Sequence, residues 1–478
     1  MKVNQGGGDM NRYLWFLLVG IVFSLGGCTL ASKYTQPAAP VPDQWPKGAA
    51  YMVSQSASGS PEVSNLKWKE FFADKQLQKI IETALENNRD LRLAALNVER
   101  ARAMYAIQRA ELLPAINAVG SGSKYRVPDD LSTTGKSMTV EEYSVNLGVS
   151  SWEIDFFGRI RSLKDQALEE YMATEQARRS AQIALISEIA KVYLTLASDR
   201  ENFKLARSTL ETRQAAYHLI KRRYEVDLAT ELDLRQAQIP LDAARVDMAL
   251  YTQRLAQDEN ALNLLAGSPV PKELMPADLG SVIPPKEIFP SLPSEVLFRR
   301  PGIMAAEHRL KGAYAFIGAA RAAIFPRISL TTSVGTASDE LSGLFKSGSG
   351  TWSFAPQIAL PIFDARTWAA LRVSKTDRKI ALTLYEKAIQ TAFREVADAL
   401  AVQGTIDRQL SAQQSLVNAV SETYRLSHKR YTKGIDSYLG VLDAQRSLYA
   451  AQQGLIAIRL AMLANQVRLY AVLGGGSE

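Results

Sequence analysis

The chain has 478 residues, a formal net charge of +7 and a single cysteine. Basic and acidic residues are interleaved along the sequence, which is typical of a solvated surface and argues against a nucleic-acid-binding patch. One cysteine excludes an internal disulfide, and three histidines without ligand spacing, His218, His308 and His428, indicate no metal site or other cofactor. The sequence contains no nucleophile–base motif, so we expect no enzymatic activity.

The N-terminus has the parts of a secretory signal peptide. Lys2 and Arg12 precede an apolar run, 13–25, and Gly26-Gly27-Cys28 follows it. The run of about 13 residues is shorter than the roughly 20 that a membrane-spanning helix needs. We therefore predict a signal peptide over residues 1–27, starting at Met1 or at Met10. A non-lipidated signal peptide or a short membrane anchor is the alternative to a lipoprotein signal.

Residues 28–66 are rich in Pro, Ser and Ala and show no apolar period, which predicts an extended leader. From Trp68 an apolar spacing of three and four predicts one helix that ends near Leu113, before Pro114. Alternation of period two through 143–149 then predicts a strand, separated from a preceding strand by a loop over about 121–142.

A second helical pattern runs from Arg159 to about Val226, roughly 100 Å at 1.5 Å per residue. After a turn, another helix is expected to end near Ala266, before Gly267-Ser268-Pro269. The turn between these two helices lies in RYEVDLATELDLRQAQ, residues 223–238, and a related stretch, RYTKGIDSYLGVLDAQ, occurs at 430–445. This similarity indicates an internal duplication.

The second copy has the same order of elements. We expect a helix from Ser294 to Pro326, strands near 328–334 and 352–360, a helix over 367–433 and a last helix to Leu473. The predicted organisation is a first repeat at 67–268, a Pro-rich connector at 269–293, a second repeat at 294–474 and a tail at 475–478.

The strands alternate apolar residues with Ser, Thr, Gly and Asn, and Tyr143 and Trp352 are placed at strand ends, as in an aromatic girdle. In a soluble protein such a sheet packs its apolar face against the core and exposes its polar face to water. Here the neighbouring helices are expected to be too long and thin to cover an apolar sheet face. Four strands are too few to close a membrane barrel, and an open edge in lipid is prohibitive. A trimer with twelve strands is the simplest closed arrangement.

Several motifs resemble the TolC-type outer-membrane efflux proteins, most closely the lipoprotein branch that serves resistance–nodulation–division multidrug pumps. The residues that carry the resemblance are Cys28, Tyr34, Pro37, Pro42, Trp45, Leu77, Asn88, Asp90, Leu91, Ala94, 152–159 (WEIDFFGR), 300–303 (RPGI), Ala306, Glu307, Phe325, Pro326, 361–364 (PIFD) and the stretch at 430–445. The chain departs from the family pattern at Gly302, where Asp is usual, and at Asp227, where the first turn usually has Gly. Asp tolerates a left-handed backbone, so the turn can still form.

The resemblance implies a mixed α and β fold: a trimeric channel-tunnel with a twelve-stranded outer-membrane β-barrel, four strands per protomer, continued by a long helical barrel in the periplasm. It also implies a lipid attached to Cys28 at the outer membrane, and a periplasmic adaptor and an inner-membrane pump as partners. No nucleic acid is expected to bind. The implied adaptor-facing tips are Leu228, Thr230, Glu231, Gly434, Ile435 and Ser437.

The resemblance places a periplasmic gate at Asp443, Leu439 and Tyr431. For Asp443 the alternative is a solvated helix surface or a charge near a helix N-terminus. For Tyr431 the alternative is packing in the helical seam. The implied function is a passive exit duct for drugs or small molecules. A type I protein secretion channel is the second hypothesis, and a lipidated periplasmic adaptor is the third.

Overall fold

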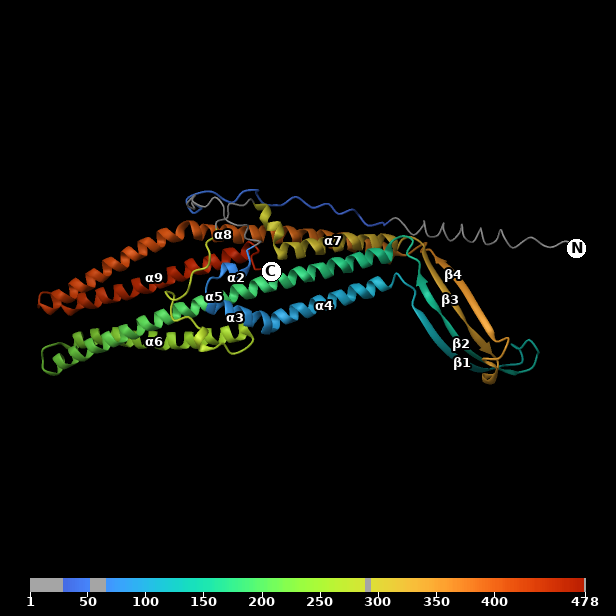
Figure 1. The fold of residues 1–478 in the computed structure, drawn as a ribbon, viewed down its shortest axis with the longest axis horizontal. Helices are drawn as coiled ribbons and strands as arrows, with labels where there is room; N and C mark the ends of the chain where they lie inside the picture. The colour runs from blue at the N-terminus through green and yellow to red at the C-terminus, as the bar shows by residue number, and fades with distance from the viewer. Residues whose placement is uncertain (1–28, 52–65, 289–293, 477–478) are drawn as a thin grey trace. The chain divides into compact units, whose positions relative to one another are not determined.

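The computed structural model describes residues 29–51, 66–288 and 294–476 (Figure 1). Within these ranges the chain is mostly helical, with one four-stranded sheet. The elements are α2 (Trp68–Phe71), α3 (Lys75–Asn87), α4 (Arg89–Ala110), β1 (Ile116–Val127), β2 (Met138–Glu153), α5 (Arg159–Glu225), α6 (Glu231–Ala266), η2 (Lys272–Leu274), η3 (Ser294–Arg299), α7 (Pro301–Ala322), β3 (Arg327–Ser338), η4 (Leu341–Gly343), β4 (Gly350–Ala359), α8 (Ala365–Thr432) and α9 (Tyr438–Val472).

The described residues form two compact units, and each draws on both halves of the sequence. The first unit contains residues 29–37, 99–173 and 306–384, and therefore all four strands. The second contains the remaining described residues, including α6 and α9 in full. The duplication is thus not two separate domains in sequence order, because equivalent parts of the two repeats pack together.

The sheet of the first unit is antiparallel, with the order β1-β2-β3-β4 (Figure 1). Its register aligns Ala118, Leu147, Val334 and Trp352 in one row across all four strands. Leu147, Val334 and Trp352 are 53, 61 and 78% exposed, so this apolar face is uncovered in the protomer. The opposite face is polar because alternate residues of a strand point to opposite sides.

Hydroxyl and amide groups line that polar face. Ser121 and Ser144 are hydrogen bonded at 2.8 Å, and Ser333 and Ser353 at 2.7 Å. Asn146 Nδ2 donates to Ser144 Oγ at 3.1 Å. The predicted alternation of an apolar face with a polar face is therefore present in the folded sheet.

The strands are longer than the sequence pattern predicted, and the expected loop over 121–142 is wrong. Ladder pairing continues from Ile116 opposite Val149 to Val127 opposite Met138, which leaves a loop at 128–137 only. Tyr143 consequently lies inside β2 and not at a strand end, whereas Trp352 lies near the start of β4. Polar residues also pair across β1 and β2, so the hairpin extends beyond the segment in which apolar and polar residues alternate.

The single helix predicted from Trp68 to Leu113 is also wrong, because it is divided into α2, α3 and α4. Asp74 Oδ1 accepts from the backbone N–H groups of Gln76 and Leu77, so it caps α3. Asn88 Oδ1 accepts from Leu91 N at 2.8 Å, and Asn88 Nδ2 donates to Leu265 O at 3.0 Å. Such side chains provide N-terminal caps and thereby start new helices.

The helix expected from Ser294 begins instead as the short 3-10 helix η3, and α7 starts at Pro301. Pro at the first helical position has no N–H to lose and a φ suited to the helix. By contrast, the long helices α5, α6, α8 and α9 agree with the predicted ranges within about two residues at most ends, as expected for such strongly periodic segments.

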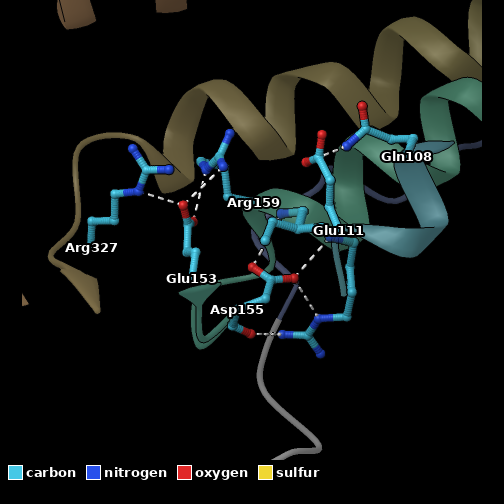
Figure 2. A network of polar contacts seen from close by, with 8 residues as sticks. Gln108, Glu111, Glu153, Asp155, Arg159 and Arg327 are labelled. Carbon is cyan, nitrogen blue, oxygen red and sulfur yellow. Dashed lines mark hydrogen bonds and ion pairs between the residues drawn. The ribbon is translucent and has the colours of Figure 1, made fainter. Parts of the chain in front are cut away.

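A buried carboxylate joins β2 to α5 and β3 within the first unit (Figure 2). Glu153 accepts from Arg159 Nε at 2.8 Å and Arg159 Nη2 at 2.9 Å, and Arg327 Nε lies 2.5 Å from Glu153 Oε2. The side chain of Glu153 is only 9% exposed, so its charge depends on these two guanidinium groups. Nearby, Asp155 accepts from the backbone N–H groups of Ile160 and Arg161 and so caps α5.

The leader runs without helix or strand over the described residues 29–51 and is held by side chains. In the first unit, Tyr34 Oη donates to Glu307 Oε1 at 3.1 Å. In the second unit, Trp45 stacks on Phe393 with ring centroids 5.0 Å apart. Cys28 and the predicted signal peptide lie outside the described residues.

Two of the described helices, α5 and α9, are long and apolar enough to cross a membrane by length and composition alone. Both contribute to the core of the second unit, through side chains such as Ile189 and Tyr193 of α5 and Val467 and Tyr470 of α9. Helix packing therefore accounts for part of their apolar character, since 56% of the apolar window of α5 and 39% of that of α9 are buried.

Candidate gate and hairpin tips

The two tips lie in the second unit, where α5 turns into α6 and α8 turns into α9 (Figure 1). In the first tip, Asp227 N donates to Tyr224 O at 3.1 Å and Leu228 N to Arg223 O at 2.7 Å. In the second, Gly434 N donates to Tyr431 O at 2.9 Å and Ile435 N to Arg430 O at 3.0 Å. This pair of bonds is the Schellman motif, which closes a helix on a left-handed residue.

The repeated Arg-Tyr therefore supplies the two carbonyl groups in the last turn of each long helix that accept these bonds. The left-handed position is Gly434 in one copy, with φ of 73°, and Asp227 in the other, with φ of 57°. Asp can occupy this region at modest cost because its short side chain interacts with the local backbone. The expectation that Asp227 keeps the turn is confirmed by this geometry.

The helices that follow the two tips, α6 and α9, begin differently. Thr230 Oγ1 accepts from Asp233 N at 3.2 Å and Asp233 Oδ2 accepts from Thr230 N at 2.9 Å, which is a capping box. Asp233 Oδ2 also accepts from Thr230 Oγ1 at 2.8 Å, and the bonds from Thr230 N and Thr230 Oγ1 lower the pKa of Asp233 below its usual range. Ser437 stands at the same position of α9, but its side chain makes no capping bond.

The proposed tip residues Leu228, Thr230, Glu231, Gly434, Ile435 and Ser437 are all exposed. Leu228 and Ile435 are 67 and 59% exposed, although both are large and apolar. Glu231 pairs with Arg235 at 3.2 Å along α6. Thus the tips present apolar side chains next to charged ones, and Thr230 also has a local capping role.

The three proposed gate residues follow one another along the second tip. Tyr431 Oη accepts from Arg223 Nη1 of the first tip at 2.9 Å, so the two hairpins are hydrogen bonded within one protomer. The ring of Tyr431 also lies 5.0 Å from that of Tyr438. Burial, followed by the neighbouring Tyr424 and Tyr431, raises the pKa of Tyr438 to about 12, so the Tyr438 phenol is neutral at ordinary pH.

Leu439 and Asp443 lie one turn apart near the start of α9, and both are exposed. Asp443 Oδ1 accepts from Arg446 Nη2 at 3.0 Å, and both side chains are well exposed. Arg446 was not among the residues predicted from the sequence, although a basic residue three positions after an acidic one on a helix is a recognisable signal. Arg223 was not among them either, although its position was visible as the Arg of the repeated Arg-Tyr.

Further polar contacts link α6 and α9 away from the tips. Tyr449 Oη donates to Asp247 Oδ2 at 3.0 Å, and Gln453 Nε2 donates to Tyr251 Oη at 3.0 Å. Arg213 of α5 stacks over the Tyr449 ring at 5.2 Å and donates to Pro240 O at 2.9 Å. The first and second hairpins are therefore joined by polar side chains at several levels.

Among the described residues, no group of three or more His, Cys, Asp and Glu could hold a metal ion. The family model described as outer membrane efflux protein matches residues 80–268 and 292–475. The chain belongs to the outer membrane efflux protein family. The two matched segments overlap the expected repeats at 67–268 and 294–474, whose exact bounds stay predictions.

Relatives and solved structures agree with this family over nearly the whole chain. The antibiotic efflux pump outer membrane protein ArpC and the toluene efflux pump outer membrane protein TtgC, both of Pseudomonas putida, are each 50% identical over 456 residues, covering 95% of this chain and 94% of the relative. The open state of the MtrE outer membrane channel of Neisseria gonorrhoeae matches with a TM-score of 0.82 and 38% identity, over 94% of this chain and 99% of that one.

These comparisons confirm the predicted family and the mixed α and β fold of a TolC-type channel. They also confirm the outer-membrane location and the function as an outer-membrane component of an efflux pump. The family description is that of a transport protein. The roles of individual gate, tip and anchor residues stay predictions.

Proposed function

We propose that this protein is a homotrimeric exit duct through which a tripartite pump passively exports small molecules. The observation that carries the proposal is the four-stranded sheet, which has an exposed apolar face, a hydroxyl-lined face and two edge strands, β1 and β4. In lipid the edge groups need partners, and barrels solve this by closing. Three copies give twelve strands, with lipid outside and a polar bore inside.

The names of two relatives support small molecules as cargo. ArpC is described as serving an antibiotic efflux pump and TtgC a toluene efflux pump. We propose antibiotics and apolar solvents as the cargo classes. Deletion of the gene should therefore raise susceptibility to such compounds without loss of any secreted protein; loss of a secreted protein with unchanged susceptibility would favour type I secretion instead.

We propose that Tyr431, Leu439 and Asp443 form the periplasmic gate. Three exposed Leu439 side chains around one axis would form an apolar constriction, and three Asp443 carboxylates would attract cations. The bond from Arg223 to Tyr431 would hold the two tips together in the closed state. Because Arg446 lies 3.0 Å from Asp443, it offsets part of this negative charge.

The gate proposal is tested by reversal potentials in planar bilayers. Asp443→Asn should reduce cation preference, whereas Arg446→Gln should increase it, because the two side chains have opposite charges. Glu231→Gln, an exposed acid on the other tip, is the matched control and should leave selectivity unchanged. If Asp443→Asn and Arg446→Gln both behave as the parent channel, Asp443 belongs to the solvated helix surface.

We propose that the tips contact a periplasmic adaptor, and through it an inner-membrane pump. Leu228 and Ile435 support this because exposed large apolar side chains at a turn favour a protein partner. Leu228→Ser together with Ile435→Ser should weaken copurification of the adaptor by an order of magnitude or more while the trimer persists. Leu264→Ser, an exposed residue at the other end of α6, is the control.

We further propose that Cys28 is diacylated after removal of residues 1–27. Gly26-Gly27-Cys28 after a short apolar run supports this. Radiolabelled palmitate should be incorporated by the parent and not by Cys28→Ser. Equal labelling of both would show that the lipid attachment site is elsewhere.

A further inference from the structure

Two acidic residues, Asp199 of α5 and Asp258 of α6, lie far along both helices from the first tip, and the charge of Asp199 contributes to the raised pKa of Asp258. Asp199 of α5 is 8% exposed, and its nearest cation, Arg254 of α6, is 3.9 Å away with a side chain that is 46% exposed. Asp258 of α6 has a buried Oδ2 atom with no hydrogen-bond partner among the described residues. When Asp199 and Asp258 are both ionised, their two negative charges are only partly offset by the half-exposed Arg254. Such like charges disfavour the ionised form of one of the acids.

The second repeat has a different pair at the equivalent places. With the offset of 207 residues that aligns Gln238 with Gln445, Asp199 corresponds to Ile406 and Asp258 to Asn465. Asn465 is 8% exposed, and its Nδ2 donates to Ala399 O of α8 at 3.0 Å. The second hairpin therefore has an apolar residue and a neutral donor where the first has two acids.

A protonated aspartic acid resembles asparagine in shape and has one O–H donor, whereas the ionised form only accepts. Protonation of Asp258 would thus remove the repulsion from Asp199 and restore a donor at this position. We propose that the Asp199–Asp258 pair is a proton-binding site that tightens the packing of α5 on α6 in acidic medium and loosens it at neutral pH.

The electrostatic surroundings agree with this proposal. Burial, then Asp199, raises the pKa of Asp258 to about 6, while Arg254 opposes the shift; burial also raises the pKa of Asp199. Next to Asp258, Glu259 is already paired with Arg200 of α5 at 3.1 Å. From α9, Arg459 pairs with Glu201 of α5 at 2.8 Å, and Gln453 donates to Tyr251 of α6. α3 also packs on α6, and among its acids Glu82 is paired with Lys69.

The direction of the effect follows from linkage. An unfolded Asp has a pKa near 3.9, so the folded state binds more protons than the unfolded state between about pH 4 and pH 6. The stability of this region therefore falls as pH rises through that window, and the loss is complete above about pH 6 to 7. A shift of about two pKa units corresponds to a roughly hundredfold change in the equilibrium between the closed and the open state of this region. Solvent screening of a half-buried site reduces this change to about tenfold over the whole pH window.

Hydrogen–deuterium exchange on the full-length protein in detergent micelles tests the proposal. After correction for the intrinsic pH dependence of exchange, amides in the last four turns of α6 should exchange about threefold faster at pH 7.5 than at pH 5, because pH 5 already lies inside the titration window. Asp258→Asn should abolish this difference by holding the site in its neutral form. Asp242→Asn changes a half-exposed acid on the same helix that pairs with Arg245, and it should leave the difference intact.

The reciprocal variant separates a proton switch from a general effect of mutation. Asn465→Asp should create a pH difference of the same sign in α9, which the parent protein lacks. An equal exchange rate at both pH values in the parent, or a difference that persists in Asp258→Asn, would overturn the proposal.

Discussion

At the residue scale, the tips show how one position of a turn accepts two different residues. Gly434 and Asp227 have the same left-handed backbone, and an ideal Cβ on Gly434 would meet nothing within 4 Å. The constraint there is therefore the backbone conformation and not the available space. Asp meets this constraint at a small cost, which β-branched residues cannot do.

We expect Asp227→Gly to stabilise the first tip by about 0.5–1 kcal/mol, because glycine adopts a left-handed backbone without a steric penalty. Gly434→Asp should weaken the second tip by a similar amount, and Gly434→Val by about 1–2 kcal/mol or more. The measurement is exchange of the Leu228 and Ile435 amides, which donate to Arg223 O and Arg430 O. Equal exchange in Gly434→Asp and Gly434→Val would show that backbone strain does not limit the turn.

At the element scale, local side-chain bonds decide where helices begin. Asp74, Asn88 and Thr230 each accept backbone N–H groups at a helix start, and they interrupt or restart helical runs that apolar spacing alone does not distinguish. Pro240 lies within α6 and does not end the helix; its carbonyl oxygen accepts from Arg213. Capping chemistry is thus more informative about boundaries here than proline.

Thr230→Ala should destabilise the start of α6 by about 1 kcal/mol through loss of the capping box. Ser437→Ala is the matched control, since Ser437 makes no capping bond, and it should have a clearly smaller effect. Hydrogen bonds from Thr230 lower the pKa of Asp233. The ionised Asp233 carboxylate therefore stabilises the start of α6 at neutral pH, and this stabilisation is lost as pH falls through the lowered pKa. Hydrogen–deuterium exchange of the Asp233 amide at pH 7 measures the capping bond directly. An equal loss of stability in Thr230→Ala and Ser437→Ala would contradict the capping role of Thr230.

Glu153→Gln should destabilise the junction of β2, β3 and α5 by about 2–4 kcal/mol, since it leaves two guanidinium groups without their shared carboxylate. Arg159 and Arg327 cannot adapt by losing a proton, because the guanidinium group stays protonated in proteins. The temperature at which the folded β-barrel form disappears on gel electrophoresis should fall. Asp364→Asn, an acid in the second repeat with a more exposed arginine partner, should lower that temperature less.

At the scale of the whole molecule, the sheet determines the assembly. A four-stranded sheet with an exposed row through Leu147, Val334 and Trp352 cannot remain a monomer in lipid, because its edge strands keep unpaired backbone groups. Native mass spectrometry of the detergent-extracted protein should give three protomers per particle. A stable monomer or a dimer in the outer-membrane fraction would rule out the twelve-stranded barrel.

The sequence by itself determined the duplication, the four long helices and the alternating strands, because these depend on periodic spacing within one segment. It also located Tyr431, Leu439 and Asp443 on one tip. It could not show that Arg223 donates to Tyr431 or that Glu153 joins Arg159 to Arg327, because such contacts connect residues whose distance along the chain has no periodic signature. Strand ends and helix breaks were likewise decided by tertiary structure, where a polar cross-strand pair or a capping side chain outweighs the apolar pattern. The carboxylate pair of Asp199 and Asp258 has the same origin: only folding places the two acids together in a site that water only partly reaches.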